Sequence, residues 1–165
     1  MTTQHWEIAT DAAEVHALLC ASDQHQGRRF GSPVPARNPA TTESRVRAGV
    51  VHLLRADDRA AAMFTLTWHP AFEPPTGVFP EAHTPAYLSR LAVHPSLGSS
   101  LAGPQCLRRA VSIARESGAD ALRAEANPDL ESTVDVMVLL GFTRCGPIFG
   151  GEGSPRRTYL HHPLG

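Results

Sequence analysis

The residues of this chain that are best suited to chemistry form a loop of mostly small side chains at 96–103, with the sequence SLGSSLAG. The loop lies between an apolar run and an amphipathic segment, and it carries no bulky polar side chain. Such a loop exposes backbone N–H groups at the positive end of a helix, where a phosphate or pyrophosphate can bind. The same pattern also fits an ordinary crossover that packs a helix on a sheet, so the loop alone leaves both interpretations open.

Two predicted elements position this loop. The run from Tyr87 to Val93 is apolar enough for a strand that is buried on both faces, and Pro95 ends it. Apolar residues then recur at helical spacing, at Leu107, Ala110, Val111 and Ala114. Gly103 and Pro104 suit the entry into this helix, and Gly118 is placed to end it. The sequence therefore predicts a strand, a small-residue loop and a helix.

The motifs continue in a characteristic order. The helix ends in ESGA at 116–119, and a strand at 121–126, Asn127, a second helix and Gly141-Phe142 follow. Together with LAVHP at 91–95, this pattern from about Tyr87 to Phe149 resembles the GNAT superfamily of acyl-CoA-dependent N-acyltransferases. The resemblance implies a single GNAT-like domain over residues 1–165. Its fold would be a mixed α/β sheet, mostly antiparallel with one splayed parallel strand pair, flanked by helices.

The resemblance also implies where acetyl-CoA or another acyl-CoA would bind as co-substrate. In the superfamily, the strand that matches 87–93 separates from its parallel neighbour, here 121–126, and exposed backbone groups bind the pantetheine arm. Leu91 and Val93 would make those main-chain contacts, and an amide at this level can polarise the thioester carbonyl. The implied cofactor-binding residues are Leu91, Ala92, Val93, Gly98, Ser99, Ser100, Leu101, Ala102, Gly103 and Asn127.

The loop departs from the pyrophosphate motif of the superfamily, which reads Gln/Arg-x-x-Gly-x-Gly/Ala. Leu97 stands where glutamine or arginine is usual, and Ser100 stands where glycine is usual. A serine costs little at negative φ, but at positive φ it is strained and its Cβ crowds the phosphate. Asn127 fits a pantetheine contact and fits equally well a turn before Pro128.

Two proton-handling groups of the superfamily are replaced here. The tyrosine that often protonates the departing thiolate corresponds to Met137, which is better explained as core filler. The strand glutamate of one branch corresponds to Tyr87, whose hydroxyl is a candidate if it faces the cleft. Glu73, Glu81 and His83 are further candidates in a Pro-rich loop that should overhang the acceptor, and each also fits a solvated loop residue.

Composition limits the functional classes. The chain has 165 residues, 42% hydrophobic and 19% charged, which fits one ordinary globular domain. A net charge of −1 gives no electrostatic case for nucleic acid or an anionic membrane surface. No apolar run is long enough to span a bilayer, and the first residues do not resemble a signal peptide. Three scattered cysteines favour reduced thiols in a cytoplasm, and the pair His161-His162 lacks metal-ligand spacing, so no metal is expected.

The remaining segments complete the expected order of elements. A strand at 6–9, a helix capped by Thr10 or Asp11, a hairpin at 49–69 and late strands at 142–149 and 157–161 are predicted. Residues 22–42 are expected to form a long loop, either a specificity lid or a mobile surface loop, with at most a short helix near 43–48. Residues 70–85 hold five prolines and are expected to be irregular.

These observations predict an N-acyltransferase that moves an acetyl or similar acyl group from acyl-CoA to an amine of a small molecule. One alternative is a GNAT-fold protein that has lost transfer activity and binds a ligand or a partner. Another is a non-transferase enzyme that uses the same cleft, for example to tailor a natural product. The exposed strands are compatible with a homodimer, which is an expectation from the superfamily.

Overall fold

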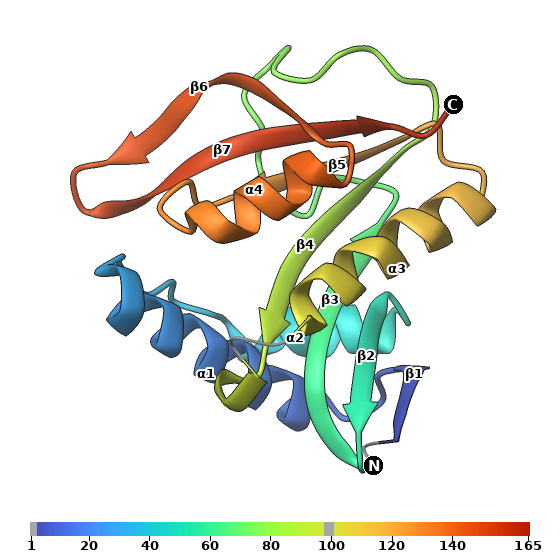
Figure 1. Cartoon of the computed structure of the whole chain (residues 1–165), viewed down its shortest axis with the longest axis vertical. Coiled ribbons are helices and arrows are strands. Elements are labelled where there is room, and N and C mark those ends of the chain that lie inside the picture. Colours follow the sequence, from blue (N-terminus) through green and yellow to red (C-terminus); the bar gives the residue numbers. More distant parts are fainter. Residues whose placement is uncertain (1–2, 98–100) are drawn as a thin grey trace. The chain divides into compact units, whose positions relative to one another are not determined.

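The structure, a computed structural model, describes residues 3–97 and 101–165. Its helices and strands follow one another in the order expected from the sequence (Figure 1). They are β1 (Gln4–Ile8), α1 (Ala12–Phe30), α2 (Pro39–Arg47), β2 (Val51–Ala56), β3 (Arg59–Thr67), β4 (Pro85–Val93), a 3₁₀ turn η1 (Pro95–Leu97), α3 (Ala102–Glu116), β5 (Ala121–Ala126), α4 (Glu131–Leu139), β6 (Thr143–Gly151) and β7 (Ser154–Pro163).

The strands form one seven-stranded sheet in the order β1-β2-β3-β4-β5-β7-β6. Strands β4 and β5 form the parallel pair, because α3 carries the chain from one to the other as a crossover, and the other neighbours are antiparallel. Four α-helices flank the sheet. The predicted fold class, a mostly antiparallel sheet with one parallel pair and flanking helices, is confirmed.

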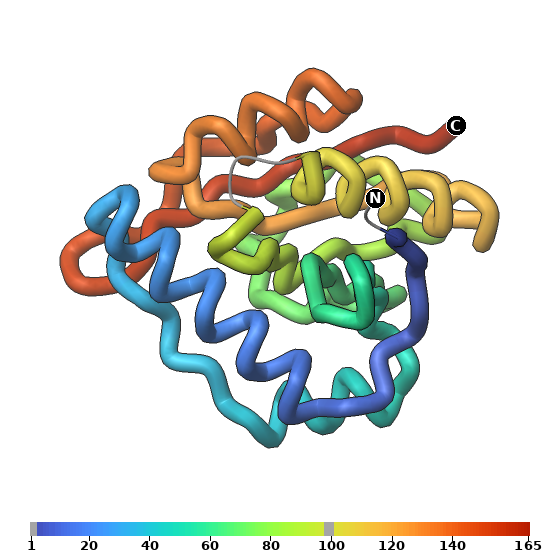
Figure 2. Tube along the Cα trace, turned by 60° about the horizontal axis from the view of Figure 1, so that its bottom comes forward, coloured from blue at the N-terminus to red at the C-terminus, as the bar shows by residue number. Residues whose placement is uncertain are grey.

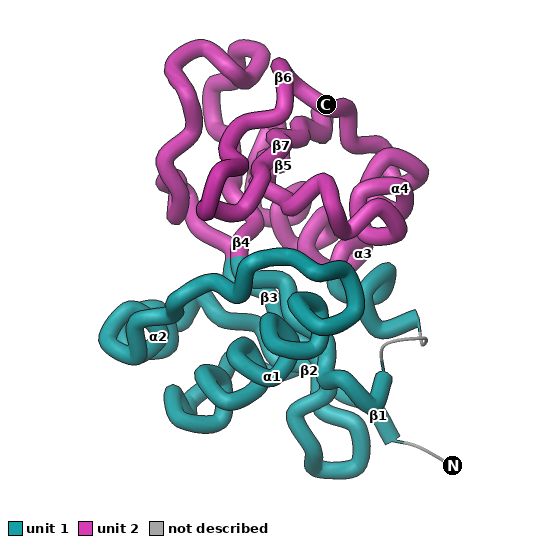
Figure 3. Tube along the Cα trace, turned by 90° about the vertical axis from the view of Figure 1, so that its left-hand side faces the viewer, with its two compact units in different colours: residues 1–65, 90–106 teal, residues 66–89, 107–165 magenta. Residues whose placement is uncertain are grey.

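The chain divides into two compact units, coloured separately in Figure 3. Unit 1 contains Met1–Thr65 and Arg90–Cys106, and unit 2 contains Leu66–Ser89 and Leu107–Gly165. Strand β4 and helix α3 each contribute residues to both units. The prediction that residues 1–165 form a single GNAT-like domain is not tested by this division into two units.

Unit 1 is built around the apolar face of α1. The helix is capped by Asp11, one of the two capping residues that the sequence allows, and its carboxylate accepts hydrogen bonds from the N–H groups of Ala13 and Glu14. One face of the helix is buried against strands β2, β3 and β4. The core members are Ala9, Val15, Leu18, Leu19, Val51, Leu53, Met63 and Ala92.

The prediction of a long loop over 22–42 is wrong. Helix α1 continues through the polar residues after Ser22 and ends at Gly31, which has a φ of 67° and donates its N–H to the Gly27 carbonyl. Helix α2 begins earlier than expected, because the Asn38 side chain accepts the N–H of Ala40 and Pro39 fits the first turn. Only residues 31–38 connect the two helices, and this segment returns alongside α1 (Figure 2).

Unit 2 combines the strands β5, β7 and β6 with an irregular segment at 68–84. Strand β7 pairs with β5 over six residues and with β6 as a hairpin, and both late strands are longer than predicted. Residues 70–84 are neither helix nor strand, as predicted, whereas Pro85, which the sequence places in this segment, is the first residue of β4. The two phenylalanines of the irregular segment pack against tyrosines of the sheet, in an aromatic cluster of Phe72, Phe79, Tyr87, Phe149 and Tyr159.

Two glycines of the β6–β7 hairpin give a first prediction. Gly150 has a φ of 83°, and an added Cβ would lie 2.5 Å from the carbonyl oxygen of Pro155. Gly153 has a φ of 93°, but its Cβ would meet no atom within 4 Å. We expect Gly150→Ala to lower the free energy of unfolding by about 2 kcal/mol. The matched variant Gly153→Ala should lower the free energy of unfolding by only about 1 kcal/mol, because it strains the backbone conformation without a close contact. Urea unfolding of both variants measures the difference, and equal losses would contradict the close contact at Gly150.

Candidate functional site

The parallel pairing of β4 and β5 ends abruptly. The register runs from Pro85 opposite Ala121 to Leu88 opposite Ala124, whereas β4 continues to Val93. Just beyond the last pair, Arg90 has a φ of 53°, a left-handed conformation that interrupts the regular strand. The hydroxyl of Ser89 is buried and has no hydrogen-bond partner among the described residues. The pairing thus ends within the stretch where the sequence predicts that β4 leaves its neighbour.

The residues predicted to contact a cofactor begin on the end of β4. Ala92 is buried in the core of unit 1, and Leu91 is half-buried. The N–H of Val93 donates to the hydroxyl of Ser22 on α1 over a long 3.4 Å. A donor with such a long bond can exchange it for a ligand at small cost. Main-chain binding by Leu91 and Val93 stays a prediction.

The loop residues predicted to hold the pyrophosphate lie partly outside the described residues, namely Gly98, Ser99 and Ser100. Leu101 is exposed, and Ala102 is buried in the first turn of α3. Gly103 follows it, and a Cβ added there would lie 4.0 Å from the Val93 side chain, which is ordinary contact. Ala102 and Gly103 are therefore the first two residues of α3.

Tyr87 is buried and bonded within unit 2. Its hydroxyl accepts a hydrogen bond of 2.9 Å from Nη1 of Arg123, the residue opposite Tyr87 on β5. The Arg123 guanidinium also donates to the carbonyl of Pro80 and lies 4.9 Å from the centroid of the Phe79 ring. Arg123 thus connects β4, β5 and the irregular segment at 68–84. Because the tyrosine oxygen serves as acceptor here, its own O–H remains available to donate.

Glu125 and Tyr159 form a second polar pair in unit 2. They are opposite each other on β5 and β7, and the Tyr159 hydroxyl donates to Oε2 of Glu125 over 3.1 Å. Burial and, next, the charge of Glu125 together raise the pKa of Tyr159 to about 12, so the phenol stays protonated at neutral pH. Glu125 follows the last β4–β5 register pair and lies on the same face of β5 as Arg123. A half-buried carboxylate held this way can accept a proton.

The other catalytic candidates are on the irregular segment. The side chains of Glu73, Glu81 and His83 are exposed. The backbone N–H groups of His83 and Thr84 donate to the Asp120 carboxylate, and these bonds, led by that of His83, lower the pKa of Asp120. Of the four candidates from the sequence, Tyr87 is the one whose side chain lies in the aromatic cluster. Catalytic roles for the other three stay predictions.

The structure describes two further residues discussed from the sequence. The side chain of Asn127 accepts the N–H of Asp129 over 2.9 Å, which is the geometry of a turn around Pro128. A pantetheine contact by Asn127 stays a prediction. Met137 is 2% exposed in the core, so the interpretation as core filler is confirmed.

A pocket of 620 Å³ lies between the irregular segment and the β6–β7 hairpin. Its lining includes Phe79, Arg144, Cys145 and His161. Burial and the nearby charge of Arg123 lower the pKa of His161, and burial raises the pKa of the Cys145 thiol. The imidazole is thus neutral at pH 7 and the thiol is unreactive, so neither group makes this pocket a nucleophilic site.

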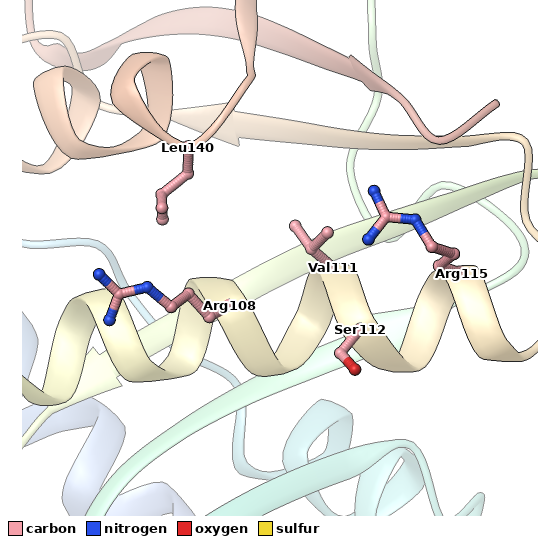
Figure 4. A pocket seen from close by; sticks show the side chains of 5 residues that line it. All are labelled: Arg108, Val111, Ser112, Arg115 and Leu140. Carbon is pink, nitrogen blue, oxygen red and sulfur yellow. The ribbon is translucent and has the colours of Figure 1, made fainter.

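A smaller pocket of 220 Å³ lies between α3 and the end of α4 (Figure 4). Arg108 and Arg115 of α3 line it together with Val111, Ser112 and Leu140, and the hydroxyl of Ser112 bonds to Glu116. Both arginines are exposed. No residue predicted from the sequence to act on a substrate lines this pocket.

Within residues 3–97 and 101–165, no three His, Cys, Asp or Glu side chains are gathered as a metal site would require. The three cysteines are unpaired, and Cys106 is fully buried, as expected for a small core residue. The helices of the described part of the chain are too short or too polar to cross a bilayer.

The strand order, the one parallel pair and the flanking helices together define the fold of the GNAT N-acetyltransferases. An N-acetyltransferase from Staphylococcus aureus Mu50 superimposes with a TM-score of 0.71 at 13% identity, over 99% of both chains. The ribosomal-protein-S18-alanine N-acetyltransferase from Escherichia coli gives 0.70 at 15%, over 99% of this chain and 94% of that one. A NatC complex bound to Gag peptide and CoA gives 0.73 at 10%, over 98% and 99%. No family profile and no curated protein matches the sequence.

Sequence reasoning missed Arg123, Glu125 and Tyr159. A signal for the first two was present, because alternate residues of the predicted strand 121–126 share a face. Tyr159 could not be added, since its register opposite Glu125 depends on the pairing of β5 with β7, two strands separated by a helix and a third strand.

Proposed function

We propose that this chain is an N-acyltransferase that moves an acetyl or similar acyl group from acyl-CoA to an amine of a small molecule. The observation that carries the proposal is the end of the β4–β5 pairing at Leu88, followed by the left-handed Arg90 and by the buried hydroxyl of Ser89, which has no partner within residues 3–97 and 101–165. A buried hydroxyl that lacks a protein partner is costly, and a polar ligand at this place would satisfy it. The bound CoA in the NatC complex of the same fold supports acyl-CoA as that ligand.

The residues fit a phosphorylated thioester in two respects. The start of α3, where Gly103 is the second residue, is a helix N-terminus of the kind that binds phosphate. The end of β4 offers the amide of Val93, whose bond to Ser22 is long. Acyl-CoA supplies an activated acyl group, and the protein's task is to hold the amine against it and to remove a proton.

Glu125 is the proton acceptor that the geometry favours. As the amine nitrogen forms its bond to the acyl carbon, the carbon–sulfur bond breaks and the amine loses a proton. The half-buried Glu125 carboxylate is positioned by the Tyr159 hydroxyl, whereas Glu73 and Glu81 are exposed on the irregular segment. The thiolate that leaves needs a proton, and the free O–H of Tyr87 is the candidate donor.

Two measurements test the proposed function. Calorimetric titration should show acetyl-CoA binding to the intact protein, and a thiol-release assay over a panel of amines should show turnover that depends on both substrates. Absence of binding together with absence of thiol release would contradict the proposal. Binding without turnover across the panel would favour a ligand-binding GNAT-fold protein.

The unusual loop allows a sharper test. In the double variant Leu97→Arg/Ser100→Gly, which restores the loop motif of the superfamily, we expect tighter acetyl-CoA binding because an arginine can pair with phosphate. An N-acyltransferase should show a lower KM for acetyl-CoA with kcat largely preserved. Tighter binding without turnover would favour the binding protein, and unchanged affinity would show that this loop does not contact the phosphates.

A further inference from the structure

Unit 1, the unit coloured teal in Figure 3, contains three arginines that lie close enough to one carboxylate and to each other for their charges to interact. Arg37 lies on the segment that returns along α1 and makes a two-pronged ion pair with Asp23, at 2.7 and 3.2 Å. Arg45 is on α2, and Arg90 is the left-handed residue of β4. Since Asp23 is engaged by Arg37, the guanidinium groups of Arg45 and Arg90 are left without a carboxylate among the described residues.

Thr42 of α2 contacts this arginine cluster (Arg37, Arg45 and Arg90) through Arg90. It is 1% exposed, its hydroxyl accepts a 3.0 Å hydrogen bond from Nη1 of Arg90, and it lies 2.8 Å from Nδ1 of His16. Arg45 follows Thr42 by three residues on α2, so both lie on the same face of the helix. The Nε of Arg45 is buried and has no hydrogen-bond partner among the described residues. The guanidinium of Arg45 therefore carries one buried N–H that makes no hydrogen bond to the described part of the chain.

The charges of the cluster do not balance. Burial lowers the pKa of Arg90, and the positive charges of Arg37 and Arg45 lower it further, with Asp23 opposing them. An arginine nevertheless remains protonated at neutral pH. Partly buried like charges with one counter-charge raise the free energy of the folded state. A purely structural network would not explain why the Nε of Arg45 finds no partner in the described part of the chain, and an incoming anion would satisfy this donor.

We infer that the arginine cluster binds an anionic group, a carboxylate or a phosphate, on the amine acceptor. The assignment to the acceptor rests on the proposed function. Guanidinium groups pair with carboxylate and phosphate oxygens in a two-pronged geometry, and Arg37 already binds the Asp23 carboxylate this way. Arg90 directly follows Ser89, a half-buried residue whose hydroxyl is buried and which comes just after the last β4–β5 pair. The acceptor class is therefore an amine that carries a negative charge, such as an amino acid or a phosphorylated amine.

Direct binding tests the cluster without turnover. N-acetylglycine, which carries a carboxylate, should raise the melting temperature of the protein, and the neutral N-acetylglycinamide should not. In Arg45→Gln and in Arg90→Gln, the affinity for N-acetylglycine should fall about 10- to 100-fold. Arg47→Gln is the matched control, because Arg47 is an exposed arginine on the same helix and the variant removes the same charge. Circular dichroism verifies that each variant is folded.

Turnover then identifies the source of the anion. Thiol release from acetyl-CoA is compared for amino acids against their amides, and for phosphoethanolamine against ethanolamine. Preference for amino acids assigns a carboxylate, and preference for phosphoethanolamine assigns a phosphate. The inference is overturned if N-acetylglycine binds no better than its amide, or if Arg45→Gln and Arg90→Gln bind it like Arg47→Gln. Release with uncharged amines alone would overturn the inference and leave the transferase intact. If the protein binds N-acetylglycine better than its amide but releases no thiol with any amine, the anion-binding cluster is supported and the proposed transferase function is contradicted.

Discussion

The variant Glu125→Gln is expected to lower kcat for acyl transfer by about 10²- to 10⁴-fold, the usual contribution of a general base. Glutamine has the shape of glutamate and can keep the hydrogen bond from Tyr159, but it cannot take up the amine proton. The KM for acetyl-CoA and the melting temperature should stay close to the wild-type values. Initial rates of thiol release at saturating substrates measure the effect.

The pH dependence of Glu125→Gln separates a base from a structural residue. Without a protein base, the rate should rise about tenfold per pH unit below the pKa of the amine, because the amine must lose its proton in solution. The matched controls Glu73→Gln and Glu81→Gln remove exposed carboxylates from the irregular segment. They should leave kcat within about twofold. If one of them loses activity and Glu125→Gln does not, the base is on that segment, as the sequence first predicts.

Replacing Arg123 with alanine is expected to lower the free energy of unfolding by about 3 kcal/mol, since several bonds to one charged group are lost together. The guanidinium contacts the Tyr87 hydroxyl, the Pro80 carbonyl and the Phe79 ring, and it lies 3.5 Å from Nδ1 of His161. The irregular segment should then open locally, with faster amide exchange over 76–84. Urea unfolding and hydrogen exchange measure the two effects.

Two variants show whether the geometry of Arg123 or only its charge is required. Arg123→Lys keeps the charge but cannot make the same planar set of bonds, so it should lose most of the stability that alanine loses. Arg144→Ala removes an exposed arginine whose ion pair with Asp135 spans 4.0 Å. It should change stability by less than about 0.5 kcal/mol. If Arg123→Lys is as stable as the wild-type protein, the positive charge alone is enough to stabilise the irregular segment at 68–84.

The strength of local signals decides how much of the fold could be predicted from the sequence. The strand at 121–126 matches β5 residue for residue, because the small, apolar run is bounded by a glycine turn and Asn127. The end of α1 was missed, because the residues after Ser22 are polar and give no periodic apolar face. The start of α2 carried a usable signal in Asn38-Pro39, a capping residue followed by a proline that fits the first turn.

The candidate site was less accessible to sequence reasoning, because its members meet through tertiary structure. Tyr87 could be chosen from its strand, but its partner Arg123 depends on the parallel register of β4 with β5. The arginine cluster joins a connecting segment, a helix and a strand, and nothing in the spacing of Arg37, Arg45 and Arg90 indicates that they meet. Positive φ at Arg90 is likewise set by the sheet, since arginine has no intrinsic preference for it.

The discontinuous order of the two units has a consequence for biosynthesis. Residues 66–89 belong to unit 2, but they are synthesised before residues 90–106, which belong to unit 1. Unit 2 is complete only when β7 has been made. The ring of Phe79 packs against the ring of Tyr159, which is synthesised 80 residues later. At the usual pace of translation this interval lasts roughly 4–16 s. Until Tyr159 has been made, the ring of Phe79 lacks this partner, so we expect the aromatic side chains of residues 66–89 to be less protected in the nascent chain than in the folded protein.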